Sequence, residues 1–281
     1  MIEMIKVAFQ GLPGAYSHAA ANAVYPDASY LPFASFEDTL AAVEDGGVDY
    51  AVIPMENAIA GRVAEIQILL LQTQLYIVGE YFQAIEHCLL GLRGTQKSDI
   101  KFVHSHFQAL SQCRKHLHVL KIEPIVAPNT AMAAQSVADG SDKSHGALSS
   151  ALAAELYGLD ILSRDMADRT DNFTRFVIIA RKPVAHKADE PNLITSFVFR
   201  VRNIPAALFK ALGGFATNGV NLIKLESYIQ DGSFIAADFY AEIEGHPEAP
   251  RVQLAFDELK FFTENLRILG SYARHTARQT K

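Results

Sequence analysis

The sequence predicts an α/β protein of two domains, the second with the ferredoxin-like order of elements. Its 281 residues, at about 150 residues per domain, predict two domains. Short apolar runs alternate with amphipathic segments up to residue 180, which is typical of strands joined by crossover helices and of mostly parallel sheets. A polar stretch with prolines near both ends, 183–192, then precedes a β-α-β-β-α-β order.

In the first part we expect short buried strands separated by helices that begin at capping residues such as Ser17 and Ser35. The expected strands lie at 5–9, 30–34, 50–53, 75–81, 88–92, 100–103, 123–126, 146–148 and 174–180. The expected helices lie at about 17–25, 36–45, 63–71, 107–117, 130–138 and 150–157.

In the second part, the helix near 203–218 has a proline in its first turn and a glycine just after its end, as helices commonly do. The other elements expected there are strands at 193–201, 221–229, 234–244 and 267–270, a hairpin turn at 230–233 and a helix at 252–265. The sequence therefore predicts domains at 1–182 and 193–273, a linker at 183–192 and a disordered basic tail at 274–281.

The composition is that of an ordinary globular protein and disfavours several classes of function. Apolar residues make up 49% and charged residues 20%. The formal net charge of −6 disfavours a nucleic-acid-binding protein. There is neither the apolar run of a transmembrane helix nor the basic and apolar start of a signal peptide. Cys88 and Cys113 have no disulfide-framework or metal-ligand spacing, so we expect a cytoplasmic protein.

Polar loops follow four of the predicted strands. In open parallel sheets, ligands bind at the carboxyl ends of strands, near helix N-termini. Each loop alone has an ordinary structural explanation, such as a tight turn or a helix cap, but their joint position favours a common cleft for a small ligand with carboxylates. The four loops are 10–17, 55–57, 104–108 and 149–150. The spaced histidine pairs His104/His106 and His116/His118 lack a third ligand, so we expect them to face solvent or core.

Three motifs resemble those of the prephenate dehydratases, and the second domain resembles the ACT regulatory domain of that family. The motifs are DYAVIPMEN at 49–57, HFQALSQC at 106–113 and NFTRF at 172–176. The resemblance implies two lobes with a cleft between them, like a periplasmic binding protein. It also implies the decarboxylating dehydration of prephenate to phenylpyruvate in phenylalanine biosynthesis, without a cofactor. Since aromatisation drives this elimination, the site must hold two carboxylates and offer one proton donor.

Carried over to this sequence, the resemblance assigns the chemistry to Thr174, Asn57 and Gln108. Thr174 would donate a positioned hydrogen bond to the leaving hydroxyl, since a free threonine is a poor acid. Asn57 and Gln108 would bind the substrate as neutral donors.

For two of the other expected substrate-binding residues, the sequence also suggests a role without direct contact to the substrate. Arg175 is a natural carboxylate clamp, but a regular strand places it opposite Thr174. Either the strand ends there or Arg175 acts indirectly. Glu56 has a structural alternative, a salt bridge or a cap, which we favour over direct catalysis. The complete set of expected substrate-binding residues is Ser17, Glu56, Ser149, Arg175 and Phe176.

In the second domain the resemblance implies an L-phenylalanine effector site between the subunits of a homodimer or homotetramer. The usual Pro-Gly-Ala-Leu and Glu-Ser-Arg-Pro motifs read PAAL at 205–208 and ESYI at 226–229. These departures leave the effector's affinity open, and a dimerisation module without an effector is the alternative. The residues expected at this site are Asn203, Ala206, Ala207, Leu208, Asn221, Glu226 and Ser227.

Two departures in the first domain, Ala58 for serine and Phe107 for proline, remove no expected catalytic group. Arogenate dehydratase is the nearest alternative activity, and the sequence alone does not decide between the two substrates. A non-catalytic amino-acid-binding regulator is the alternative of another class, against which intact Thr174, Asn57 and Gln108 argue. Because no long helical segment precedes Lys6, a fused chorismate mutase is not expected.

Overall fold

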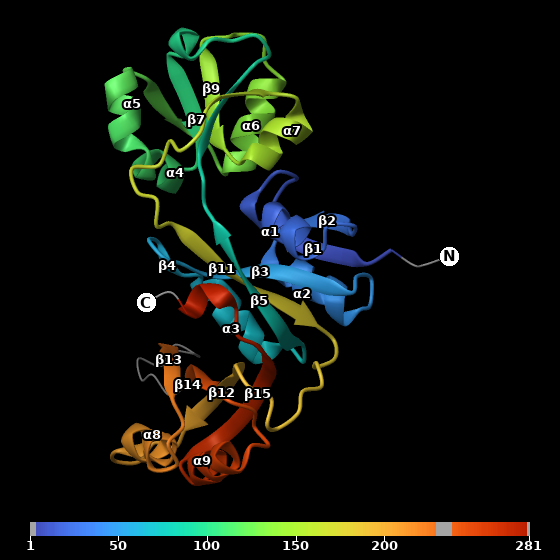
Figure 1. Cartoon of the computed structure of the whole chain (residues 1–281), viewed down its shortest axis with the longest axis vertical. Helices are drawn as coiled ribbons and strands as arrows, with labels where there is room; N and C mark the ends of the chain where they lie inside the picture. Colours follow the sequence, from blue (N-terminus) through green and yellow to red (C-terminus); the bar gives the residue numbers. More distant parts are fainter. Residues whose placement is uncertain (1–3, 229–237, 280–281) are drawn as a thin grey trace. The chain divides into compact units, whose positions relative to one another are not determined.

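The computed structural model describes residues 4–228 and 238–279 (Figure 1). The chain divides into two compact units. The first comprises Met1–Val63 and Tyr81–Phe176, and the second comprises Ala64–Glu80 and Val177–Lys281. Strands β5 (Tyr76–Ala84) and β11 (Phe173–Ala180) each run from one unit into the other.

The first sheet has the strand order β2-β1-β3-β11-β5. Strand β1 (Lys6–Gln10) pairs in parallel with β2 (Ser29–Phe33) and with β3 (Tyr50–Asn57). Helices α1 (Tyr16–Val24) and α2 (Phe36–Glu44) pack against β1, which is why its central residues form a continuous apolar run. A two-residue strand, β4 (Gly61–Arg62), pairs antiparallel with the end of β3.

The second sheet has the order β10-β6-β9-β7-β8 and lies entirely in the first unit. Its strands are β6 (Cys88–Gly91), β7 (Phe102–Ser105), β8 (Glu123–Val126), β9 (His145–Ser149) and β10 (Asp160–Ser163). The helices associated with it are α4 (Phe107–Gln112), α5 (Arg114–Leu120), α6 (Thr130–Ala138) and α7 (Ala151–Tyr157), and a short 3-10 helix spans Lys97–Asp99. Asn129 and Ser150 cap α6 and α7, since their side chains accept the N–H of Met132 and Ala153.

Several local predictions are corrected by this part of the structure. The second sheet is mixed, because β6 pairs antiparallel with both β9 and β10. The helix expected at 107–117 is interrupted at Cys113, whose φ of −109° and ψ of 10° are not helical. Ser17 does not cap α1, which begins at Tyr16 after Ala15; the Ser17 side chain is instead buried in the first turn.

The third sheet is antiparallel, has the order β13-β14-β12-β15 and belongs to the second unit. Its described strands are β12 (Leu193–Val201), β13 (Leu222–Tyr228), β14 (Asp238–Glu244) and β15 (Thr263–Ala273). Helices α8 (Ala207–Thr217) and α9 (Pro250–Phe261) share with them a core that includes stacked phenylalanines. This is the expected β-α-β-β-α-β order. The predicted turn at 230–233 and the start of the strand at 234–244 lie outside the described residues.

Segments distant in sequence join this sheet through charged side chains. Helix α3 (Ala64–Gln72) precedes β5, and the Arg267 guanidinium donates to the carbonyl groups of Leu70, Thr73 and Leu75. At the other end of the chain, Thr276–Gln279 form a 3-10 helix where the sequence predicts disorder. The reason is a long-range contact: Arg278 forms ion pairs with the fully buried carboxylates of Glu80 and Glu242, both at 2.8 Å.

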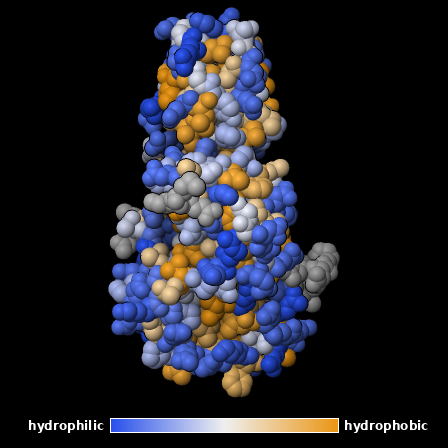
Figure 2. All heavy atoms as spheres, turned by 90° about the vertical axis from the view of Figure 1, so that its right-hand side faces the viewer, coloured by the Kyte–Doolittle hydropathy of each residue, from blue (hydrophilic) through white to orange (hydrophobic). Residues whose placement is uncertain are grey.

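The surface is mixed in character. On the face shown in Figure 2, hydrophobic residues form several small patches between hydrophilic ones. Scattered exposed apolar residues of this kind are normal for globular proteins. Within residues 4–228 and 238–279, none of the helices has the length and apolar character needed to cross a bilayer.

Candidate active site

A cavity of about 450 Å³ lies in the first unit. It is lined from two sides: by the first sheet with α1, which we call the first lobe, and by the second sheet with its helices, the second lobe. Five of the expected site residues line it, namely Thr174, Asn57, Gln108, Ser17 and Phe176. The other lining residues are Tyr16, Pro54, Ala60, Gly61, Arg62, Val63, Ile85, His87, His106, Ala109, Gln112, Thr130 and Asn172.

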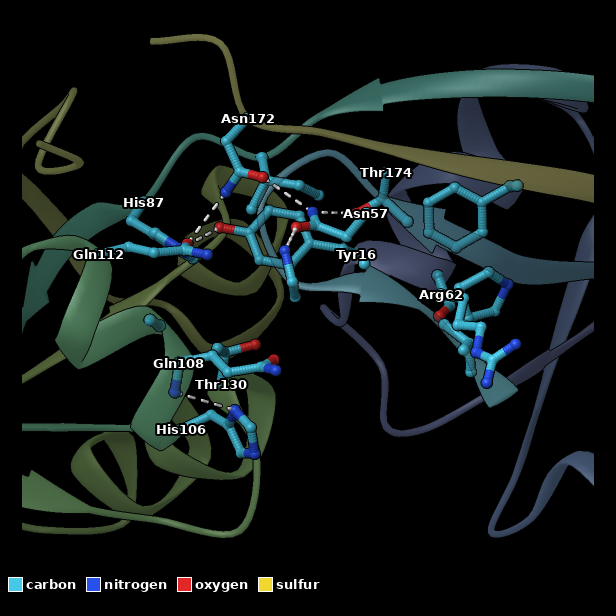
Figure 3. A pocket seen from close by; sticks show the side chains of 18 residues that line it. Tyr16, Asn57, Arg62, His87, His106, Gln108, Gln112, Thr130, Asn172 and Thr174 are labelled. Carbon is cyan, nitrogen blue, oxygen red and sulfur yellow. Dashed lines mark hydrogen bonds between the residues drawn. The ribbon is translucent and has the colours of Figure 1, made fainter. Parts of the chain in front are cut away.

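Thr174 is held by the side-chain amide of Asn57 (Figure 3). The Asn57 Nδ2 atom lies 2.9 Å from Thr174 Oγ1 and 2.8 Å from Asn172 Oδ1. The Asn57 Oδ1 atom accepts the backbone N–H of Ile59 and of Ala60. Both amide hydrogens of Asn57 are therefore directed at protein acceptors, so this side chain orients Thr174.

On the second lobe, Gln108 lies in the first turn of α4 beside His106, which caps that helix. The Gln108 backbone N–H donates to His106 Nδ1 at 3.3 Å. Figure 3 shows Gln108, His106 and Thr130 together, apart from the Asn57–Thr174 group. The two lobes thus present separate polar groups to one cavity, which suits a ligand with polar atoms at both ends.

Glu56 and Arg175 do not line the cavity but pair with each other. Arg175 Nη1 lies 3.2 Å from Glu56 Oε1, and the Arg175 side chain is 1% exposed. Strand alternation explains this placement, because Thr174 and Phe176 face the cavity and Arg175 lies between them. Of the two alternatives for Arg175, the geometry matches the indirect one.

Ser149 also lies away from the cavity. It is the last residue of β9, it is fully buried, and it is not among the lining residues. Its neighbour Ser150 has a structural role, since its hydroxyl donates to the Gly14 carbonyl at 2.6 Å and caps α7. The geometry therefore does not support Ser149 as a contact of a ligand in this cavity.

Sequence reasoning missed several lining residues. Among the lining residues that the structure describes, Arg62 is the only lysine or arginine, and it lies on β4, a strand too short to predict. Tyr16, His87 and Gln112 form a hydrogen-bonded group that reaches Asn172. Gln112 and Asn172 lie inside the motifs singled out above, but nothing in the sequence relates them to His87.

Burial shifts the pKa values of Tyr16 and His87 in this group, and also that of the nearby Cys113. Burial raises the pKa of Tyr16 well above its ordinary value, with smaller contributions from Cys88, Cys113 and Glu86. Burial also lowers the pKa of His87. Tyr16 therefore keeps its proton and His87 is neutral near pH 7. Burial raises the pKa of the Cys113 thiol to about 12, which makes it a poor nucleophile.

The residues expected at the effector site lie in the second unit, around the start of α8 and along β13. Ala206 has a left-handed φ of 59° directly before α8. Leu208, one of the residues expected at this site, packs against the core of its own domain. On the strands, Glu226 pairs with Lys224 at 3.3 Å, and Asn221 donates to Glu244 at 3.1 Å. Of the remaining expected residues, Ala207 is buried, whereas Asn203 and Ser227 are exposed.

No group of three or more His, Cys, Asp or Glu side chains within residues 4–228 and 238–279 is arranged to hold a metal ion.

The fold and the cavity define a two-lobed α/β ligand-binding domain followed by an ACT-like domain. The sequence model of the family described as prephenate dehydratase matches residues 7–184. The chain therefore belongs to the prephenate dehydratase family, as its motifs predict.

Individual relatives agree with this assignment. A bifunctional N-acyl-homoserine lactone acylase/prephenate dehydratase of Komagataeibacter europaeus is 48% identical over 266 residues, covering 95% of each chain. Arogenate dehydratase/prephenate dehydratase 1, chloroplastic, of Arabidopsis thaliana is 42% identical over 95% of this chain and 72% of its own. The structure of prephenate dehydratase from Arthrobacter aurescens in complex with L-Phe superimposes with a TM-score of 0.87 at 30% identity, over 96% of this chain and 90% of its own.

Proposed function

We propose that this protein converts prephenate to phenylpyruvate, water and CO2. The observation that supports this most directly is the Asn57–Thr174 hydrogen bond at the cavity. Because Asn57 donates to Thr174 Oγ1, the hydroxyl hydrogen of Thr174 is left for another acceptor. The leaving hydroxyl of prephenate is such an acceptor.

The elimination places simple demands on this site. The bond from the ring carbon to the hydroxyl breaks, and the departing oxygen takes up a proton to leave as water. The bond from the ring to its carboxylate breaks to release CO2, and that electron pair completes the aromatic ring. Thr174 stabilises the departing oxygen through a positioned hydrogen bond, and solvent supplies the proton overall.

The charges around the cavity favour prephenate over arogenate. The lining residues include the guanidinium of Arg62, and none of the described lining residues is Asp or Glu. Prephenate carries two carboxylates, for which a guanidinium and amide donors are suitable partners. Arogenate replaces the side-chain keto group by an ammonium, and a buried ammonium requires an acceptor of opposite charge to offset its desolvation.

We also propose that L-phenylalanine regulates the enzyme through the ACT-like domain. Support comes from the relative solved in complex with L-Phe. Following the sequence-based expectation, this regulation takes place in a cytoplasmic homodimer or homotetramer.

The test incubates the purified full-length protein separately with prephenate, arogenate and an N-acyl-homoserine lactone, and identifies each product by mass spectrometry. The expected result is phenylpyruvate from prephenate, with slower formation of phenylalanine from arogenate. The Thr174→Ala variant is the matched control, and it should abolish most of the dehydratase signal. Faster turnover of arogenate would reassign the substrate. Acylase activity without dehydratase activity would overturn the proposal, and binding without any turnover would favour the regulator.

A further inference from the structure

We propose that Tyr16 and His87 are positioning residues for the dehydration. They close a chain of hydrogen bonds that ends at Thr174, and the direction of each bond in this chain determines where the Thr174 hydroxyl donates. The inference rests on the proposed function for its kinetic consequences, but the chain itself is a property of the protein without substrate.

The direction of the chain is fixed at one end by the backbone. Asn57 Oδ1 accepts the N–H groups of Ile59 at 3.0 Å and Ala60 at 2.8 Å, so the amide of Asn57 has a single orientation. Its Nδ2 group therefore donates to Asn172 Oδ1 at 2.8 Å and to Thr174 Oγ1 at 2.9 Å. Asn172 Oδ1 is then an acceptor, which orients the Asn172 amide as well.

The orientation of Asn172 determines the donor and acceptor of each of the next two hydrogen bonds. The Asn172 Nδ2 group donates to Gln112 Oε1 at 2.9 Å, so this oxygen of Gln112 is an acceptor. The same oxygen lies 2.9 Å from His87 Nε2. Two lone pairs cannot face each other at this distance, so the proton of the neutral imidazole is on Nε2. His87 Nδ1 is consequently the bare nitrogen.

Tyr16 completes the chain. Its hydroxyl oxygen lies 2.8 Å from His87 Nδ1 and 2.9 Å from the carbonyl oxygen of Glu86. The single hydroxyl hydrogen of Tyr16 has two acceptors within reach, the bare Nδ1 and the Glu86 carbonyl oxygen, and its donation to Nδ1 is the arrangement that completes the chain. The lowered pKa of His87 and the raised pKa of Tyr16, both due to burial, are consistent with a neutral His87 and a protonated Tyr16. Figure 3 shows these side chains joined one to the next.

Removing the Tyr16 hydroxyl should disturb Thr174 through the chain. Without that donor, His87 can take the other tautomer, whose bare Nε2 would face Gln112 Oε1. Gln112 then turns its amide, so that its NH2 group faces that of Asn172, and Asn172 loses its fixed orientation beside Asn57, the residue that donates to Thr174. The side chains to which the chemistry is assigned, Thr174, Asn57 and Gln108, are themselves unchanged. The expected loss is therefore in kcat more than in KM.

The first test is spectroscopic and uses no substrate. Long-range 1H–15N spectra of 15N-labelled protein near pH 7 distinguish the two neutral histidine tautomers by which ring nitrogen is bare. The His87 signals are assigned by their absence in His87→Gln. We expect the tautomer with the proton on Nε2 in the wild type, and a changed mixture in Tyr16→Phe. A proton on Nδ1, or a charged imidazole, in the wild type would overturn the inference.

The second test compares tyrosine variants in the prephenate assay. Tyr16→Phe should lower kcat by about 3- to 10-fold, as expected for one net hydrogen bond, with KM within about twofold of the wild type. Tyr30→Phe is the matched control, because the Tyr30 hydroxyl also makes two hydrogen bonds, to Asn22 and Tyr25, but Tyr30 does not line the cavity. Equal kcat values for the two variants, or a Tyr16→Phe effect confined to KM, would contradict the positioning role.

Two substitutions of His87 test whether the position of the Nε2 donor matters for kcat, rather than the size of the side chain. A glutamine amide can reach the place of Nε2 and donate to Gln112, whereas an asparagine amide reaches only the place of Nδ1. We expect His87→Gln to retain more of the wild-type kcat than His87→Asn, and the reverse order would contradict the chain. If wild-type protein does not turn over prephenate at all, the proposed function fails, and the tautomer measurement still decides whether the chain exists.

Discussion

Arg175 Nη1 lies 3.2 Å from Glu56 Oε1, and this ion pair connects β11 to the neighbouring strand β3 next to the Asn57–Thr174 hydrogen bond. The guanidinium is almost completely buried, whereas the carboxylate is 32% exposed. Each partner is the sequence neighbour of a residue in that hydrogen bond. The ion pair therefore helps to fix the relative position of the two strands that carry Asn57 and Thr174.

The first prediction concerns the stability that depends on this pair. Glu56→Gln should lower the free energy of unfolding by about 3 kcal/mol, because it replaces the carboxylate that pairs with the buried guanidinium of Arg175 by a neutral amide. Chemical denaturation measures the change. Asp257→Asn is the control, since its pair with Lys260 is exposed and should contribute less than about 1 kcal/mol. A loss no larger than that of the control would show that the pair has no structural importance.

The second prediction is a dependence of stability on pH. Burial lowers the pKa of His18, whose Nδ1 accepts the Gly14 N–H at 3.1 Å, and the pKa of His87 is lowered for the same reason. In the unfolded chain both groups take up a proton near their ordinary pKa of about 6.5, while in the folded protein they do so only at a lower pH. The unfolded state therefore gains stability as the pH falls below that value. The free energy of unfolding should decrease by at most about 1.4 kcal/mol per pH unit for each histidine.

Urea denaturation at a series of pH values from about 7.5 down to about 5.5 spans this window. His18→Asn keeps an acceptor for Gly14 but removes one titrating group, so it should reduce the slope. A slope that is unchanged in this variant would contradict the assignment to His18.

The third prediction concerns Ala206, which precedes α8 with a φ of 59°. A left-handed conformation costs a residue with a Cβ roughly 1–2 kcal/mol, and glycine avoids that cost but loses more entropy on folding. Ala206→Gly should therefore stabilise the protein by about 1 kcal/mol, measured by denaturation. Ala207→Gly is the control one residue later. Ala207 is the first residue of the helix and has no left-handed φ, so glycine there should destabilise by up to about 1 kcal/mol. Destabilisation by Ala206→Gly would contradict the claim that the left-handed conformation of Ala206 is strained.

The fourth prediction concerns the effector. If L-phenylalanine binds the ACT-like domain, a concentration of about 100 times its Kd should stabilise the protein by about 2.7 kcal/mol. It should raise the melting temperature and inhibit the dehydratase, and L-tyrosine should act more weakly because its hydroxyl would enter an apolar site. L-leucine is the control ligand in both assays. If L-phenylalanine neither raised the melting temperature nor inhibited the enzyme, the ACT-like domain would be a dimerisation module without an effector. The catalytic proposal would not be affected.

The sequence predicts the elements well where a hydrophobic pattern alone decides them. The strand expected at 193–201 has those bounds in the structure, because most of its residues are apolar and it is bounded by polar turns. Patterns of this kind do not specify which of two adjacent polar residues reaches a cavity. The sequence places Ser149 at the cavity, yet in the structure Ser149 is buried at the strand end and Ser150 caps the helix.

The same limit applies to contacts between distant segments. The motifs identify Asn57 and Thr174, but the hydrogen bond between them joins residues 117 positions apart. Tyr16 and His87 belong to no common motif, and only the packing of α1 against the segment before β6 brings them together. Arg278 likewise orders the C-terminal turn through carboxylates far away in the sequence.

The central claim is that the Thr174 hydroxyl donates to the leaving group. The most direct measurement is kcat with prephenate for Thr174→Ala and Thr174→Ser, compared with the wild type. Loss of one positioned proton donor should lower kcat of Thr174→Ala by about 10²- to 10⁴-fold, with the thermal stability nearly unchanged. Thr174→Ser keeps the hydroxyl and should retain much of the activity. A Thr174→Ala enzyme that kept more than about a tenth of the wild-type kcat would contradict the role given to this hydroxyl.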